Sequence, residues 1–143
     1  MNEPGLSINF PLKLVGDEHN AANVVIELSG TISWYGKGGW VEGITFRRPK
    51  ISSGEGSSED MLRVVDGGKL DMVHSVIDNT GSSGASAVAF EGAGSRGRWF
   101  GVTVSGGRDQ GVKLDSGARL ELLEVSNEVF SDGLQTSMFE VIF

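Results

Sequence analysis

The stretch RVVDGGKLDMVHSVIDN at residues 63–79 contains the features that decide the fold. A short run of apolar residues ends in Asp-Gly-Gly, and a second apolar run follows directly. Runs of about five to eight residues rich in Val, Ile and Leu, bounded by Gly, Asn and Asp, are typical of β-strands. The stretch therefore predicts two strands joined by a tight corner.

The first strand and its corner recur along the chain. Four copies are present: IELSG at 26–30, RVVDGG at 63–68, VAFEGAG at 88–94 and VKLDSGA at 112–118. Their anchor residues are 37, 25 and 24 residues apart, and a further 25 residues lead to a fifth anchor; the anchors are Leu28, Val65, Phe90, Leu114 and Phe139. A repeat of this length predicts a solenoid in which each copy stacks on the next.

A second strand follows each corner, at 40–46, 70–78, 98–104 and 119–125. No segment has a convincing helical period. Without crossover helices, parallel pairing requires that the chain coils, so that each strand meets its copy one turn later. We predict an all-β fold, a right-handed parallel β-helix of about five rungs, as one domain over residues 1–143. A β-sandwich is the alternative architecture.

One corner of the coil is predicted to carry loops of variable length. The Gly/Ser-rich segment 47–60 accounts for the long first interval and is interpreted as an insertion. Shorter loops at 79–86, 105–111 and 126–133 follow the same strands. Loops grouped on one side of a repeat protein often form its binding surface.

Composition narrows the function classes. The chain has 143 residues, a net charge of −7, 22 glycines and no cysteine. The negative charge disfavours binding to nucleic acid or to an anionic membrane surface. The absence of cysteine excludes disulfides and thiolate metal sites. No apolar run approaches the ~18 residues of a membrane span and no signal peptide is recognisable, so a cytoplasmic protein is expected.

The chain stops on the apolar segment MFEVIF, without a polar cap. Open ends of solenoids expose unpaired strand edges, which natural repeat proteins cover. Two interpretations follow. Either the chain is a fragment of a longer solenoid, or it forms a homo-oligomer through the edge strand Phe139–Phe143.

Two phrases, GGKLDMVHSVIDN and GARLELLEVSN, resemble the carbohydrate-binding and sugar-hydrolysis repeats of the pectate-lyase-like right-handed β-helix superfamily. Such repeats also occur in F-box and SH2-domain-binding adaptor proteins. The resemblance covers roughly residues 20–130 and implies the fold more firmly than an activity. Paired aspartates, Gly-His-Gly and Trp-x-Asp-His, which mark enzymes of the superfamily, are absent. Their absence favours a protein that is not an enzyme.

The repeat places an acid at the same corner of successive rungs: Asp66, Glu91, Asp115 and, in the last copy, Glu140. In-register rungs would bring these carboxylates to about 4.8 Å from one another. Solvent screening, a bound Ca²⁺ ion or a raised carboxyl pKa could each accommodate the repulsion. No other cofactor is expected. Basic residues that follow these acids predict a parallel ladder of bases: Lys69, Arg96, Arg98 and Arg119.

Aromatic and basic side chains suggest a saccharide site, because sugars stack on exposed indoles and arginines bind sugar carboxylates. Trp40 and Trp99 occupy similar points of successive strands, which favours stacking in the core. The candidate binding residues are therefore Trp34, Tyr35, Arg47, Arg48, Lys50 and Asp109.

Two functions follow from these observations. The first is a non-catalytic β-helix binding or scaffold module, self-associating through its open ends, with a protein or a glycan as partner. The alternative is a polysaccharide-acting lyase or hydrolase, or a carbohydrate-binding domain. A convergent pair of acids and a base beside exposed aromatic residues would favour the enzyme.

Overall fold

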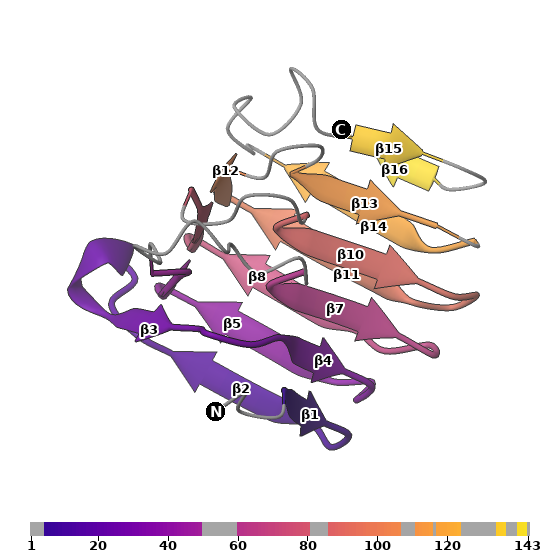
Figure 1. Cartoon of the computed structure of the whole chain (residues 1–143), viewed down its shortest axis with the longest axis horizontal. Helices are drawn as coiled ribbons and strands as arrows, with labels where there is room; N and C mark the ends of the chain where they lie inside the picture. The colour runs from indigo at the N-terminus through magenta and orange to yellow at the C-terminus, as the bar shows by residue number, and fades with distance from the viewer. Residues whose placement is uncertain are drawn as a thin grey trace.

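The computed structural model is a stack of parallel β-strands that form a solenoid of about four turns (Figure 1). Four turns contribute a strand to each of three sheets, so the predicted all-β solenoid is confirmed, with about four turns in place of five. The structure describes residues 5–49, 60–80, 86–106, 111–115, 117–123, 134–136 and 140–142.

Three parallel sheets, which we call A, B and C, form the sides of the coil. Sheet A comprises β1 (Leu6–Ile8), β4 (Ile32–Trp34), β7 (Leu62–Val65), β10 (Val88–Glu91), β13 (Val112–Leu114) and β15 (Leu134–Thr136). Sheet B comprises β2 (Leu12–Val15), β5 (Gly39–Glu42), β8 (Leu70–Val73), β11 (Arg96–Phe100), β14 (Arg119–Leu123) and β16 (Glu140–Ile142). Sheet C comprises β3 (Val25–Glu27), β6 (Thr45–Arg47), β9 (Val76–Asn79) and β12 (Thr103–Gly106).

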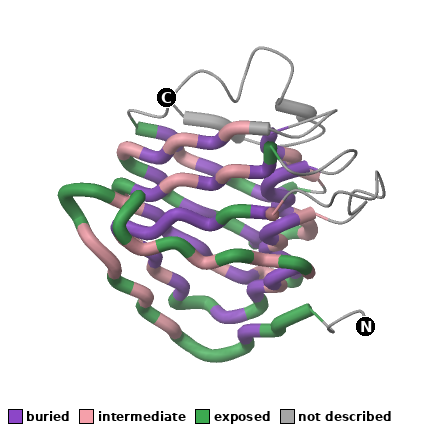
Figure 2. Tube along the Cα trace, turned by 60° about the vertical axis from the view of Figure 1, so that its left-hand side comes forward, coloured by how far each residue is buried: buried purple, intermediate pink, exposed green. Residues whose placement is uncertain are grey.

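Alternate residues of each strand face the inside of the coil, and the parallel register stacks them from turn to turn. In sheet A, Trp34 pairs with Ile8 and Val64, while Phe90 pairs with Val64 and Leu114. All five of these residues are at most 2% exposed. Figure 2 shows buried positions that recur in successive turns. The core is thus continuous along the solenoid, because one turn alone cannot bury its apolar face.

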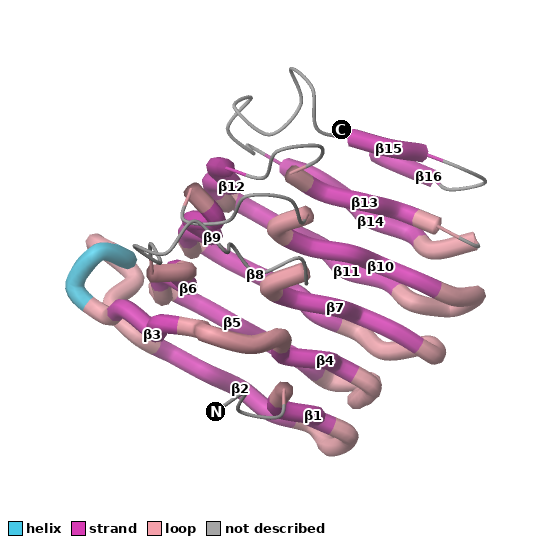
Figure 3. The backbone as a smooth tube through the Cα atoms, viewed as in Figure 1, coloured by secondary structure: helices cyan, strands magenta, loops and turns pink. Residues whose placement is uncertain are grey.

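The corner between sheets A and B requires left-handed backbone. Asp66 and Gly67 have φ of +52° and +79°, and Gly92 and Gly117 occupy the same corner with φ of +89° and +82°. Glycine adopts this conformation without a steric penalty, which explains the Gly-rich end of each repeat. Figure 3 shows these loops one above another at the side of the stack.

Each predicted second strand with both halves described is in fact two strands, one in sheet B and one in sheet C. A left-handed residue separates them: Gly43, His74 or Gly101, with φ of +66°, +46° and +61°. A Cβ atom on Gly101 would lie 2.5 Å from Cδ2 of His74, so glycine is needed next to the histidine. The apolar pattern continues through this corner, and therefore a period-two pattern alone does not reveal the bend.

Two of the predicted repeat copies were assigned to the wrong sheet. The N–H of Leu28 donates to the carbonyl of Arg47, beside sheet C, and Glu140 pairs with Arg119 in sheet B. The partner of Phe90 in β7 is Val64, one residue before the predicted anchor Val65. Apolar strands with a polar end occur in all three sheets, so the short phrase does not distinguish one sheet from another.

The connections from sheet C to sheet A have variable lengths, as predicted. They span residues 48–61, 80–87 and 107–111, whereas the β3–β4 connection spans only 28–31. Arg47 belongs to β6, so the long connection begins one residue later than the predicted insertion.

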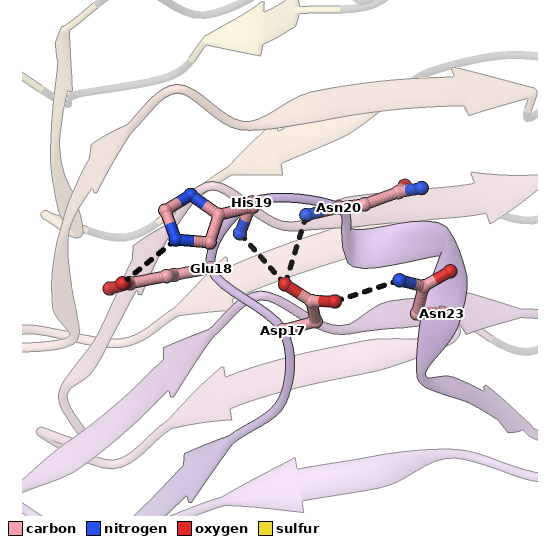
Figure 4. Close-up of polar contacts among 5 residues, drawn as sticks. All are labelled: Asp17, Glu18, His19, Asn20 and Asn23. Atoms are coloured by element: carbon pink, nitrogen blue, oxygen red, sulfur yellow. Dashed lines mark hydrogen bonds and ion pairs between the residues drawn. The ribbon is translucent and has the colours of Figure 1, made fainter.

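A polar turn after β2 leads the first turn into η1 (Ala21–Asn23), the one helical element of the described residues (Figure 4). Oδ1 of Asp17 accepts the N–H groups of His19 (2.9 Å) and Asn20 (3.3 Å), and Oδ2 accepts Nδ2 of Asn23 (2.7 Å). The Asn23 hydrogen bond, followed by the His19 N–H, lowers the pKa of Asp17. No helix in this part of the chain has the length and apolar character to cross a membrane.

The predicted oligomer interface includes β16, the last strand of sheet B, which pairs with β14. Phe139 and Phe143 lie outside the described residues. Association through this edge therefore stays a prediction.

Candidate functional site

The prediction that Trp34 is an exposed binding residue is wrong. Its side chain points into the coil with Ile32, because the two residues lie on the same side of β4, and it is 0% exposed. Tyr35, the next residue, is 40% exposed and remains available. The adjacent Lys-Gly-Gly suggested a loop, but strand alternation placed the two aromatic residues in opposite environments.

The predicted basic residues of the long connection lie in two different environments. Arg47 is exposed on sheet C, where Nη2 pairs with Oε1 of Glu27 at 2.5 Å. Arg48 is only 3% exposed, and its guanidinium donates to the carbonyl oxygens of Ser29 and Gly30 at 3.3 Å. Burial of Arg48 makes it a structural clamp and removes it from the set of accessible residues.

Lys50 and Asp109 lie outside the described residues. Tyr35 follows sheet A, whereas Arg47 is in sheet C. The structure therefore does not bring the described members of the predicted binding set together.

The predicted carboxylate ladder is only partly in register. Asp115 follows Leu114, the partner of Phe90, so it lies beside Glu91 along the stack. Glu91 itself pairs with Val65, which leaves Asp66 one residue beyond the ladder, in the exposed corner. Among the described residues, no group of three or more His, Cys, Asp or Glu side chains could hold a metal ion. Ca²⁺ binding at these acids stays a prediction.

The outer face of sheet A has a polar groove of about 400 Å³ that includes Asp60, Arg63 and Glu91. Nη2 of Arg63 lies 2.6 Å from Oε2 of Glu91. Burial raises the pKa of Asp60, and the charge of Glu91 acts in the same direction; the Ser86 N–H and Arg63 oppose this rise. The groove therefore holds one salt-bridged acid and one acid that burial keeps more basic than usual.

The outer face of sheet B contains a ladder of cations that runs along the solenoid. Lys69 is bridged to Arg96, and Arg96 pairs with Arg119 on the next strand. Parallel strands lie about 4.8 Å apart, so one cation follows another at every turn. This register confirms the ladder of bases that the sequence predicts for these three residues.

A hollow of about 260 Å³ opens over this ladder, and we call it the cationic hollow. Its charged lining comprises Lys69, Asp71, Arg96, Arg98, Arg119 and Glu121. Four basic groups thus face two acids, in a chain whose net charge is −7.

Both acids of the cationic hollow are already paired. Oδ2 of Asp71 lies 3.2 Å from Nζ of Lys69, and its Oδ1 accepts the Arg98 N–H at 2.9 Å. Oε2 of Glu121 lies 2.8 Å from Nε of Arg98. Within the described part of the chain, Arg96 has no ion-pair partner, and its side chain is exposed. The uncompensated charge of the hollow is therefore positive.

A second hollow, of about 210 Å³, adjoins the first, and we call it the aromatic hollow. Trp40 of β5 and Phe100 of β11 line it from opposite sides, and the short side chains Asp71 and Val73 of β8 lie between them. Phe100 is 38% exposed. A large–small–large order across three neighbouring strands leaves a gap about two strand spacings wide, close to 10 Å.

The walls of the aromatic hollow are held in place by their neighbours. Nε1 of Trp40 donates to Oε2 of Glu42 at 3.1 Å, and Nζ of Lys13 lies 5.7 Å from the centre of the Trp40 ring. The rings of Phe100 and His74 are 5.4 Å apart, centre to centre. These contacts orient both aromatic walls before any ligand arrives.

The expectation that Trp40 and Trp99 stack together in the core is wrong. Trp40 pairs with Asp71 and is half-buried on the outer face, whereas Trp99 pairs with Met72 and is 1% exposed inside the coil. Phe100 was missed entirely. The alternation of Arg98, Trp99 and Phe100 carried the signal, since residues on either side of an inward tryptophan must face outward.

Comparison of the chain with protein-family models, with curated proteins and with solved structures found no match. The site must be interpreted from its own geometry and charge.

Proposed function

We propose that this chain is a non-catalytic β-solenoid module that binds a saccharide on the outer face of sheet B. The aromatic hollow carries this proposal. Trp40 and Phe100 supply apolar ring faces on either side of a gap of suitable width, and Asp71 and Arg98 supply hydrogen-bonding groups within it. Concave sites with aromatic walls and a few fixed polar groups are typical of ligand pockets.

The absence of an available acid on this face favours binding over catalysis. Asp71 is 8% exposed and both of its oxygens are engaged, while Glu121 is paired with Arg98. Glycoside cleavage by general acid–base chemistry needs two carboxyl groups that flank the scissile bond. The described acids of sheet B instead hold neighbouring cations in position.

A binding assay with two matched aromatic variants tests the proposal. Immobilised neutral and acidic oligosaccharides would be screened with the whole chain, and the hits measured by calorimetry. We expect Trp40→Ala to weaken binding at least about tenfold, or roughly 1.4 kcal/mol. Tyr35→Ala, which removes an exposed aromatic residue elsewhere, should leave affinity unchanged. The proposal is wrong if no saccharide binds or if the two variants have equal effects.

A second candidate is a polysaccharide-acting enzyme of the pectate-lyase-like superfamily, with its site in the groove of sheet A. The raised pKa of Asp60 supports this candidate, because a general acid must stay protonated near the working pH. The salt bridge between Arg63 and Glu91 speaks against it, since it occupies the second acid. New reducing ends or unsaturated products released from polysaccharides, and lost in Asp60→Asn, would favour the enzyme over the binding module.

A further inference from the structure

We infer that the saccharide bound by sheet B is acidic, and that its carboxylate or sulfate group occupies the cationic hollow. This inference rests on the proposed function and specifies the class of ligand. It starts from the contiguity of the two hollows, because Asp71 and Arg98 line both of them. A sugar ring between Trp40 and Phe100 would therefore have the cationic hollow directly beside it.

The charge of the cationic hollow defines the group that it would accept. Asp71 and Glu121 are each paired with a base, and the side chains of Arg96 and Arg119 are exposed at the ladder positions beside these pairs. A guanidinium fork matches the two oxygens of a carboxylate or a sulfate. Three cations stacked at about 4.8 Å repel one another, and an oxyanion between them would relieve that repulsion.

The direction of the ladder fits a chain of acidic sugars better than a single anion. Lys69, Arg96 and Arg119 belong to three successive turns, so the ladder runs along the solenoid axis. A linear oligosaccharide laid along this axis would meet one cation at each turn. The flat faces of its rings would suit Trp40 and Phe100, which an acidic peptide, with no ring faces along its backbone, would not use.

The first test compares ligands that differ only in charge. The wild-type chain would be titrated with an oligosaccharide of uronate units, with its carboxyl-reduced neutral counterpart, and with a sulfated oligosaccharide. We expect at least about tenfold tighter binding of one or both acidic ligands at low salt, with the advantage shrinking as NaCl rises toward about 0.5 M. Whichever acidic ligand binds more tightly identifies the oxyanion.

Two arginine variants then locate the charge preference. Arg96→Gln should lose most of the preference for the acidic ligand and leave affinity for the neutral one unchanged. Arg47→Gln, an exposed arginine on sheet C, is the matched control and should retain the full preference.

The outcomes separate this inference from the function on which it rests. Equal affinity for charged and neutral saccharides, with no effect of Arg96→Gln, would overturn the acidic ligand and keep the saccharide module. Tighter binding of a poly-glutamate peptide than of any acidic saccharide would also overturn it. Failure of every saccharide to bind, or indifference to Trp40→Ala, would remove the proposed function itself.

Discussion

Sheets A and B are built alike, yet their outer faces differ. Both have six parallel strands with apolar residues stacked inside. Outside, the first strands of sheet A carry small polar residues such as Ser7 and Ser33, and sheet B carries Trp40, Arg98 and Phe100. Inward positions are restricted by the close packing of the core. Outward positions are not, and this freedom allows one face of the solenoid to become a site.

The largest expected effect comes from the tryptophans of the two sheets. Trp34→Ala should lower the free energy of unfolding by about 3–5 kcal/mol, because it opens a cavity in the core. Trp40→Ala, on the outer face, should cost about 1 kcal/mol or less. Urea denaturation of both variants checks the comparison. Similar losses would mean that the outer face of sheet B is part of the stabilising core.

A smaller contrast is expected between the two arginines of the β6 strand end. Arg48→Ala should lower the free energy of unfolding by about 1–3 kcal/mol, since the buried carbonyl groups of Ser29 and Gly30 lose their donor. Arg47→Ala removes a solvent-exposed ion pair and should cost about 0–1 kcal/mol. Thermal denaturation of the two variants gives the ranking. An Arg47 variant that is the less stable of the two would contradict the burial argument.

The smallest effect concerns the pH dependence that Asp60 confers on sheet A. Because burial raises the pKa of Asp60 in the folded chain, its ionisation disfavours folding. The stability of the wild type relative to Asp60→Asn should therefore fall as the pH rises from about 3.8 through the raised pKa. Denaturation at a series of pH values measures this difference. A difference that stays constant or increases over that range would contradict the burial of the carboxyl group.

The sequence predicted the solenoid because the repeat and the period-two pattern are local properties of the chain. The copies in β7, β10 and β13 were assigned to the same side of the coil, and they do form neighbouring strands of sheet A. The copies at Leu28 and Phe139 were misassigned because strand ends in different sheets have similar composition. The left-handed bend at His74 was missed, since a non-glycine residue gave no sign of it.

The candidate site was less accessible to prediction. The bases of the ladder were recognised because they follow the repeated corner, and the register confirms the alignment of Lys69, Arg96 and Arg119. The aromatic hollow was not recognised. It depends on the relative heights of Trp40, Asp71 and Phe100, which lie on three strands separated by about 30 residues each.

The sequence by itself determined that the chain coils into parallel strands with an apolar interior, because hydrophobic periodicity and Gly-containing corners act over a few residues. Only the tertiary structure decided which side chains face outward together. A shift of one residue in register moves a side chain to the opposite face of a strand. The position of Trp34 in the core, and of Trp40 at the surface beside a row of cations, is therefore a property of the stacked turns.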